Sequence, residues 1–269
     1  VDPKGPSFTW RIRAADSERI PWIDAAWHDK FILHGAGYEG RYAAGLDGKQ
    51  HGIYSDDYMS TEVLSGRALM VAQPFSPDVV RKHWLLDGAM RALALDRIES
   101  VGFAEDNIHR QVVRWARGGE VRVNRGVEDW SAGGRVLPQY GFHVRVPGQD
   151  GVREAAVERR NGKVVEWSRS PSMLYFNGRG AAIEFEGVSA GGAIRLERQG
   201  ETVTVTPAPG GPALQVRIHW GKLPWTLPRP RGIEALREDG SVAGASALMW
   251  DGDDVPIECA AGVFAYRLK

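Results

Sequence analysis

One short stretch of the chain combines apolar residues with side chains capable of acid–base chemistry. Residues 19–35, RIPWIDAAWHDKFILHG, contain Asp24, His28, Asp29 and His34. Carboxyl and imidazole groups are common proton donors and acceptors in enzymes, and paired carboxyl groups hydrolyse glycosidic bonds. Burial of an unpaired carboxylate or imidazole costs several kcal/mol of free energy. These side chains therefore need polar partners or an opening to water.

Further polar residues follow this stretch. Glu39 and His51 lie in a Gly-rich segment, and Asp56 and Asp57 begin a predicted helix. The near-continuous apolar run before His28 favours a strand buried on both faces. The carboxyl ends of such strands bind ligands in parallel α/β proteins, so we expect one cleft there. The predicted substrate-binding residues are His28, Asp29, His34, Glu39, Asp56 and Asp57.

A purely structural role for each carboxylate stays open. Asp29 could pair with an arginine or with backbone amides, and Asp56 and Asp57 could serve only the helix N-terminus. The histidines lack the HExxH spacing and have no cysteine partners, so no metal site is predicted. The GK[ST] phosphate loop and the GxSxG elbow are absent from the sequence, and no cofactor is predicted. Cys259 is the single cysteine and is expected to be buried.

Composition disfavours some classes of function. The 269 residues carry 34 Lys and Arg against 34 Asp and Glu, so no global field attracts nucleic acid or an anionic membrane. No apolar run is long enough to span a bilayer. The ten tryptophans exceed what a core of this size needs, and exposed ones could stack on sugar rings. The chain begins at Val1 without a signal-peptide pattern, so we expect a processed chain or one piece of a longer protein.

The first 104 residues alternate strand and helix signals. A helix is predicted from an N-cap at Ser55 to Gly66, followed by a buried strand over 68–75. Ser76 and Pro77 then begin the clearest helix in the sequence. Its predicted buried stripe consists of Val80, Trp84, Leu86, Met90 and Leu93. This order favours a parallel sheet or a partial (β/α) barrel, since the units are too few to close a barrel of eight.

The pattern changes near residue 105. From there on, apolar and polar residues alternate and turns such as NG, QG and DG recur, which is typical of antiparallel hairpins and sandwiches. The predicted fold class is therefore α/β followed by all-β. Residues 1–104 are expected to be the C-terminal segment of a barrel-like α/β domain. Residues 105–269 are expected to form an antiparallel β-sandwich region that could divide again near residue 148.

Three segments resemble one enzyme family. RIPWIDAAWHDKFILHG resembles the approach to the last barrel strand in large (β/α)8 glycoside hydrolases related to endo-α-N-acetylgalactosaminidases. SDDYMSTEVLSGRALMV (55–71) is similar to the helix and strand that follow it there. EVRVNRGVEDWSAGGRVLPQYGFHVRV (120–146) is similar to the β segment after such barrels. The resemblance covers roughly residues 19–147 and implies the C-terminal portion of a hydrolase acting on a glycan or polysaccharide.

The resemblance also implies what such a portion would lack. The catalytic carboxyl groups of these hydrolases lie on earlier barrel strands, so the catalytic residues are unknown here, and the chain would need those strands for turnover. The expected partners are a carbohydrate and either the missing barrel portion or a second chain. A polysaccharide-acting enzyme would be exported, so a secreted or periplasmic location is expected.

Two other interpretations remain. The chain could be a non-catalytic carbohydrate- or partner-binding β protein with surface tryptophans as its ligand platform, or an interaction subunit that completes its barrel with a second chain. An exposed apolar face on residues 1–104 would favour the hydrolase portion or the interaction subunit. A closed, independently packed unit would favour the binding protein.

Overall fold

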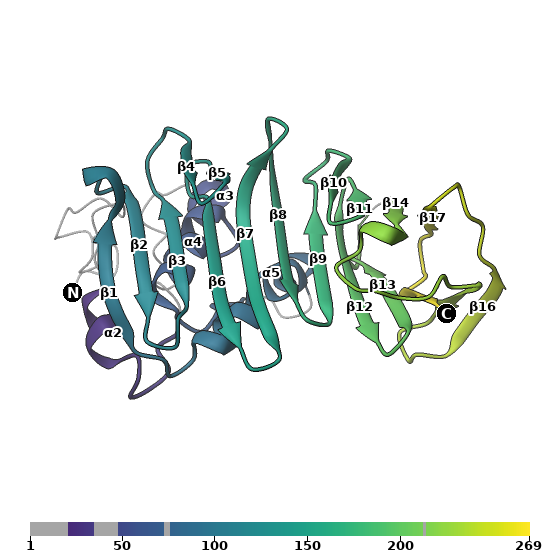
Figure 1. The fold of residues 1–269 in the computed structure, drawn as a ribbon, viewed down its shortest axis with the longest axis horizontal. Helices are drawn as coiled ribbons and strands as arrows, with labels where there is room; N and C mark the ends of the chain where they lie inside the picture. Colours follow the sequence, from purple (N-terminus) through teal and green to yellow (C-terminus); the bar gives the residue numbers. More distant parts are fainter. Residues whose placement is uncertain (1–20, 35–47, 73–75, 212–213) are drawn as a thin grey trace. The chain divides into compact units, whose positions relative to one another are not determined.

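The chain forms two compact units, Val1–Arg159 and Arg160–Lys269. The computed structural model describes residues 21–34, 48–72, 76–211 and 214–269 (Figure 1). Within these ranges no helix is long and apolar enough to cross a membrane.

Unit 1 is built on an antiparallel sheet with the strand order β1-β2-β3-β6-β7. Its strands are β1 (Ile98–Phe103), β2 (Arg110–Trp115), β3 (Glu120–Asn124), β6 (Phe142–Gly148) and β7 (Gly151–Arg160). A separate hairpin pairs β4 (Trp130–Ala132) with β5 (Arg135–Leu137), and a 3-10 turn, η3 (Ala104–Asp106), follows β1.

One face of this sheet is the core of unit 1. Val113 pairs with Val121, Val121 with Val144 and Val144 with Ala155, so a row of fully buried side chains crosses four strands. On β2, β3 and β6 the neighbouring residues, such as Arg114, point to the opposite face and are more exposed, whereas on β7 both neighbours of Ala155 are buried. This alternation is the period-two pattern expected of a sheet covered on one side only.

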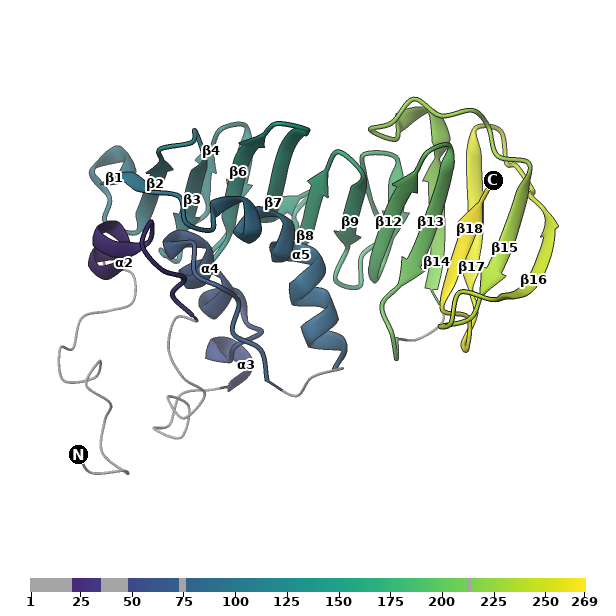
Figure 2. The same cartoon turned by 90° about the horizontal axis from the view of Figure 1, so that it is seen from below.

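Helices cover the buried face. They are α2 (Trp22–Trp27), α4 (Asp56–Ser65) and α5 (Pro77–Leu93), and α3 (Gly48–His51) packs against α4. Figure 2 shows α2, α4 and α5 on one side of the strands of unit 1.

The predicted ends of α4 and the predicted start of α5 are confirmed. Ser55 Oγ accepts a hydrogen bond from the Tyr58 amide at 3.2 Å, and Gly66 ends α4 in the left-handed conformation at φ 68°. Ser76 Oγ accepts from the Val79 amide at 3.3 Å. Trp84 and Met90 are buried as the sequence predicted.

The predicted fold class is wrong. Every strand pair recorded among the described residues is antiparallel, and these residues contain no α/β barrel segment. Residues 22–27 form helix α2 rather than a strand, and residues 68–72 contribute only an isolated parallel bridge between His34 and Ala68. The apolar run suggested a strand, but Asp24 and His28 are four residues apart, which places both on one helix face.

Unit 2 consists of two antiparallel sheets. The larger one has the order β8-β9-β12-β13-β18-β15-β16 and the smaller one β10-β11-β14-β17. The larger sheet comprises β8 (Lys163–Ser170), β9 (Met173–Asn177), β12 (Ala193–Gln199), β13 (Thr202–Pro207), β15 (Gly232–Leu236), β16 (Val242–Ala247) and β18 (Ala265–Leu268). The smaller one comprises β10 (Ile183–Phe185), β11 (Val188–Ala190), β14 (Leu214–His219) and β17 (Asp254–Cys259), and a 3-10 turn, η4 (Trp220–Lys222), follows β14.

Aromatic residues join the two sheets of unit 2. Phe185 on β10 stacks on Trp167 of β8, with ring centroids 4.7 Å apart, and on Phe176 of β9 at 5.7 Å. Cys259 is buried as predicted, and burial raises the pKa of its thiol to about 11. The sandwich-like all-β character expected for this part of the chain is confirmed, and after residue 105 the described helical segments are single 3-10 turns.

Candidate functional site

Helix α2 has its polar side inward. Asp24 is 1% exposed and accepts two hydrogen bonds from Arg67, from Nε at 2.7 Å and from Nη2 at 3.0 Å. His28 is 3% exposed, and its Nδ1 and Nε2 each lie 2.9 Å from a backbone carbonyl oxygen, of Asp96 and Gly66 respectively. Because carbonyl oxygens only accept, the imidazolium form can donate to both, whereas the neutral ring can donate to one.

These contacts explain why the apolar stretch contains a carboxylate and an imidazole. His28 connects the end of α2 to Gly66 at the C-terminus of α4 and to Asp96. Its ring also packs edge-on against Trp115, with ring centroids 4.7 Å apart. Asp24 and His28 therefore attach α2 to the rest of unit 1. The predicted position of His28 and Asp29 at the end of a buried strand is wrong.

The other predicted residues lie in different surroundings. Asp29 is near the surface, where a hydrogen bond from Lys30 lowers the pKa of its carboxyl group. His34 is exposed at the bridge to Ala68. Asp56 lies 3.8 Å from the guanidinium of Arg81. Glu39 lies outside the described residues.

Asp57 is the predicted residue that belongs to a dense polar cluster. Its Oδ1 accepts from Arg125 Nη2 at 2.8 Å, and its Oδ2 lies 2.7 Å from His51 Nδ1. Arg125 also donates to Ser60 Oγ at 2.9 Å and to Thr61 Oγ1 at 2.7 Å. The side chains of Asp57 and Arg125 are buried, while that of His51 is 22% exposed. In this cluster the partly exposed His51 imidazole therefore rests on the buried ion pair of Asp57 and Arg125.

Tyr140 completes this cluster. Its half-buried ring lies 5.4 Å from the guanidinium carbon of Arg125 and 6.4 Å from the His51 ring centroid. The Tyr140 amide donates to Asn124 O at 2.7 Å, and the residue has φ 61°, a conformation that side chains other than glycine rarely adopt. We call His51, Asp57, Arg125 and Tyr140 the Asp57 cluster.

A second ionic group lies inside unit 1. Lys82 Nζ lies 2.7 Å from Glu62 Oε2 and donates to the carbonyls of Ile53 and Met70 at 2.8 and 2.7 Å. Glu62 Oε1 accepts from the Met70 amide at 2.6 Å. Both side chains are fully buried, and burial raises the pKa of Glu62 to about 7 although the charge on Lys82 opposes the shift. Burial likewise lowers the pKa of Lys82. The pair joins three backbone segments.

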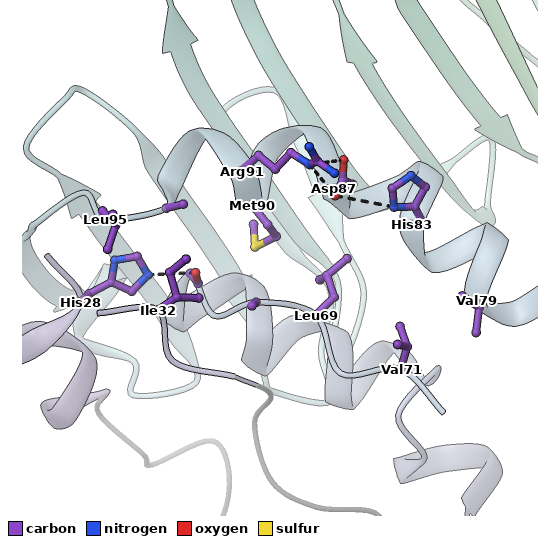
Figure 3. Close-up of a pocket in the computed structure, with 13 residues that line it drawn as sticks. His28, Ile32, Leu69, Val71, Val79, His83, Asp87, Met90, Arg91 and Leu95 are labelled. Carbon is purple, nitrogen blue, oxygen red and sulfur yellow. Dashed lines mark hydrogen bonds and ion pairs between the residues drawn. The ribbon is translucent and has the colours of Figure 1, made fainter. Parts of the chain in front are cut away.

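An apolar pocket of about 420 Å³ lies beside α5 (Figure 3). Its apolar lining includes Ile32, Leu69, Val71, Val79, Met90 and Leu95. His28 forms part of its wall beside Ile32. Asp87 lies along one edge, where it accepts from Arg91 Nε at 2.9 Å and lies 3.6 Å from His83 Nδ1. Its volume is within the range of small-molecule sites, but its polar groups are few and mutually paired.

Several residues of these groups were not predicted. Arg125 and Tyr140 carry no local sequence signal, because Arg125 lies 68 positions from Asp57 and only the fold brings them together. His51 was noted in the Gly-rich segment, and its partner Asp57 was expected at a cleft. The charged residues of α5, such as Lys82 and Asp87, have the spacing of an ordinary solvent-exposed helix face in the sequence.

No group of three or more His, Cys, Asp or Glu side chains within the described ranges is placed to hold a metal ion. Comparison of the chain with protein-family models, curated proteins and solved structures found no match. The functional inference therefore rests on the residues and geometry of this chain.

Proposed function

We propose that this chain is a glycan-recognising, non-catalytic portion of a glycoside hydrolase, and that it contacts sugar through the Asp57 cluster. The observation that carries the proposal is the partly exposed His51 imidazole beside the half-buried Tyr140 ring, with Asp57 and Arg125 buried next to them. Sugars are amphipathic, and they bind where hydrogen-bonding groups lie beside an aromatic ring.

The chemistry of each member suits binding. Asp57 accepts from His51 Nδ1 and from Arg125, so both of its oxygens are engaged and it positions the imidazole rather than the sugar. His51 Nε2 is then the nitrogen that remains to form a hydrogen bond with a ligand hydroxyl. Because Ser60 and Thr61 of α4 hold Arg125, and Arg125 in turn holds the Asp57 carboxylate, the imidazole is oriented before a ligand arrives.

Asp56 and Asp57, two of the predicted site carboxylates, give no support to a catalytic role. Hydrolysis of a glycosidic bond requires two carboxyl groups on opposite sides of that bond. Asp56 lies near Arg81, and the oxygens of Asp57 are engaged by Arg125 and His51. The proposal therefore leaves the catalytic carboxyl groups to another part of the enzyme.

The alternative of a tryptophan platform in unit 2 receives less support. Trp167, Trp220 and Trp225 are buried there, and Trp250 is half-buried with the Arg229 guanidinium 4.7 Å from its ring. A sugar platform needs an open ring face, whereas these rings contribute to packing or contact an arginine.

The test is titration of the whole chain with N-acetylgalactosamine, galactose and glucose by calorimetry. We expect saturable binding of at least one sugar. His51→Ala and Tyr140→Asn should each weaken it about fivefold or more, the loss of one hydrogen bond or ring contact. Asparagine is chosen because it tolerates the positive φ of Tyr140.

His83→Ala is the matched control, because His83 is an exposed histidine on α5 outside the cluster. It should bind sugar like the wild type. Absence of sugar binding at millimolar concentration, or equal binding by all variants, would overturn the proposed site. Hydrolysis of an aryl glycoside by the chain alone would overturn the assignment as non-catalytic.

A further inference from the structure

Helix α2 and the turn after it present a row of large apolar side chains outward. Their exposed fractions are 73% for Trp22, 59% for Ile23, 51% for Trp27, 49% for Phe31 and 61% for Ile32. We call these five residues the α2 face. Scattered single apolar residues are common on protein surfaces, but five within eleven consecutive positions of one short helix and turn form a patch.

The face is continuous. The Trp27 and Phe31 rings stack with centroids 6.0 Å apart and planes 14° from parallel. Ile32 lines the 420 Å³ pocket together with Val71 and Leu95, which are 47% and 52% exposed. The patch therefore extends from α2 into the apolar pocket, which offers a partner a recess for its own side chains.

The area of the patch is that of an interface. An aromatic side chain carries roughly 150–250 Å² of surface, so the exposed fractions place the α2 face on the order of 600 Å². The largest apolar patch of a typical monomer is roughly 300–600 Å². Each partner in a stable complex contributes about 800 Å². The face together with the pocket rim reaches that size.

The orientation of α2 is fixed from inside. Asp24 pairs with Arg67, and His28 lies within hydrogen-bond distance of two backbone carbonyls, so turning the helix to bury its tryptophans would break the ion pair of the buried Asp24 and move the imidazole away from both carbonyls. A helix of six residues normally gains its stability by burying an apolar side. The apolar side of α2 faces away from unit 1, so it gains this stability only when another surface covers it.

We propose that the α2 face is an interface with a second copy of this chain. The formal net charge is zero, with 34 basic and 34 acidic residues, so two copies meet without long-range repulsion. The charged residues next to the face in the sequence, Asp29 and Lys30, pair with each other. A two-fold axis through the patch brings the same apolar residues of both copies together, as in most homodimers.

The test is sedimentation velocity of the whole chain between about 1 and about 100 μM, a range that covers the affinities of such interfaces. We expect a concentration-dependent dimer that persists at high salt, because apolar burial is not screened. Trp27→Asp and Ile32→Asp should each raise the dissociation constant at least tenfold. Val127→Asp is the matched control, because Val127 is 80% exposed in unit 1 and is not a member of the face.

Melting temperatures would distinguish loss of the interface from loss of the fold, since all three substitutions are at exposed positions. A wild-type monomer throughout the concentration range would overturn the proposal. That outcome includes the case in which another polypeptide covers the face. Dimers that form equally well with Trp27→Asp and Ile32→Asp would also overturn it. Sugar titration is independent of this result, so the two proposals can fail separately.

Discussion

Replacing Lys82 by Met should destabilise unit 1 strongly. Lys82 is fully buried, lies 2.7 Å from Glu62 Oε2 and donates to the carbonyls of Ile53 and Met70. Methionine keeps most of the volume of the side chain but removes the charge and all three donors. The substitution therefore leaves Glu62 buried without its cation and two carbonyls without this donor.

The magnitude follows from what remains buried. Removing one member of a buried ion pair costs about 3–5 kcal/mol of unfolding free energy, and we expect about 4 kcal/mol for Lys82→Met. The double variant Glu62→Gln/Lys82→Met removes both charges of the pair, and the new glutamine side chain can still accept from the Met70 amide. Its cost should fall to about 2 kcal/mol, mostly from the two carbonyls that Lys82 no longer satisfies.

The same pair gives the stability of unit 1 a pH dependence. Burial raises the pKa of Glu62 from 4.5 to about 7, so between these values the folded protein binds more protons than the unfolded chain. Stability associated with Glu62 is therefore full below pH 4.5 and is lost as pH rises to about 7. The loss is about 3 kcal/mol, and the double variant should lack it.

The assay is urea unfolding followed by tryptophan fluorescence at several pH values across this window. The reasoning is refuted if Lys82→Met costs less than about 1 kcal/mol, since that is the size of a single neutral hydrogen bond. It is also refuted if the wild type and the double variant have the same slope of stability against pH. Far-ultraviolet circular dichroism confirms that each variant is folded before unfolding is measured.

Two further predictions concern backbone positions. Gly66→Ala should cost about 2–4 kcal/mol, because its Cβ would lie 2.4 Å from Trp115 Cη2 at a residue with φ 68°. Gly88→Ala, in the interior of α5 with no atom within 4 Å of the new Cβ, should instead stabilise by about 0.5–1 kcal/mol. Thermal unfolding of both glycine variants tests these predictions, and equal changes in melting temperature would contradict the steric argument. Ser76→Ala should cost about 1 kcal/mol through the lost cap of α5, and an unchanged melting temperature would show that the cap contributes nothing.

Local signals in the sequence were sufficient for some elements. The Ser-Pro start of α5 and the Ser55 and Gly66 ends of α4 are confirmed because caps are decided by residues within one turn. Alternation with glycine turns likewise predicted the antiparallel strands after residue 105. Helix α2 was missed because its apolar residues were assumed to be buried, whereas Asp24 within the helix and His28 at its C-cap are the buried residues.

The candidate site was less accessible to sequence reasoning. Asp57 was predicted to contact a ligand, and the structure places it under His51 as the residue that orients the imidazole. Its partner Arg125 follows β3 and reaches α4 only through the packing of helices on the sheet. Tyr140 reaches the cluster from the loop before β6. No periodicity or spacing predicts contacts between residues this far apart in the chain.

The most direct test of the proposed function is nitrogen NMR of the histidine side chains during sugar titration. His51→Gln identifies the His51 resonances, and His83 serves as an internal reference on α5. We predict that the sugar that binds in calorimetry shifts the Nε2 signal of His51 in a saturable manner while the His83 signals stay unchanged. Binding of that sugar with no change at His51 would contradict a sugar contact at the Asp57 cluster.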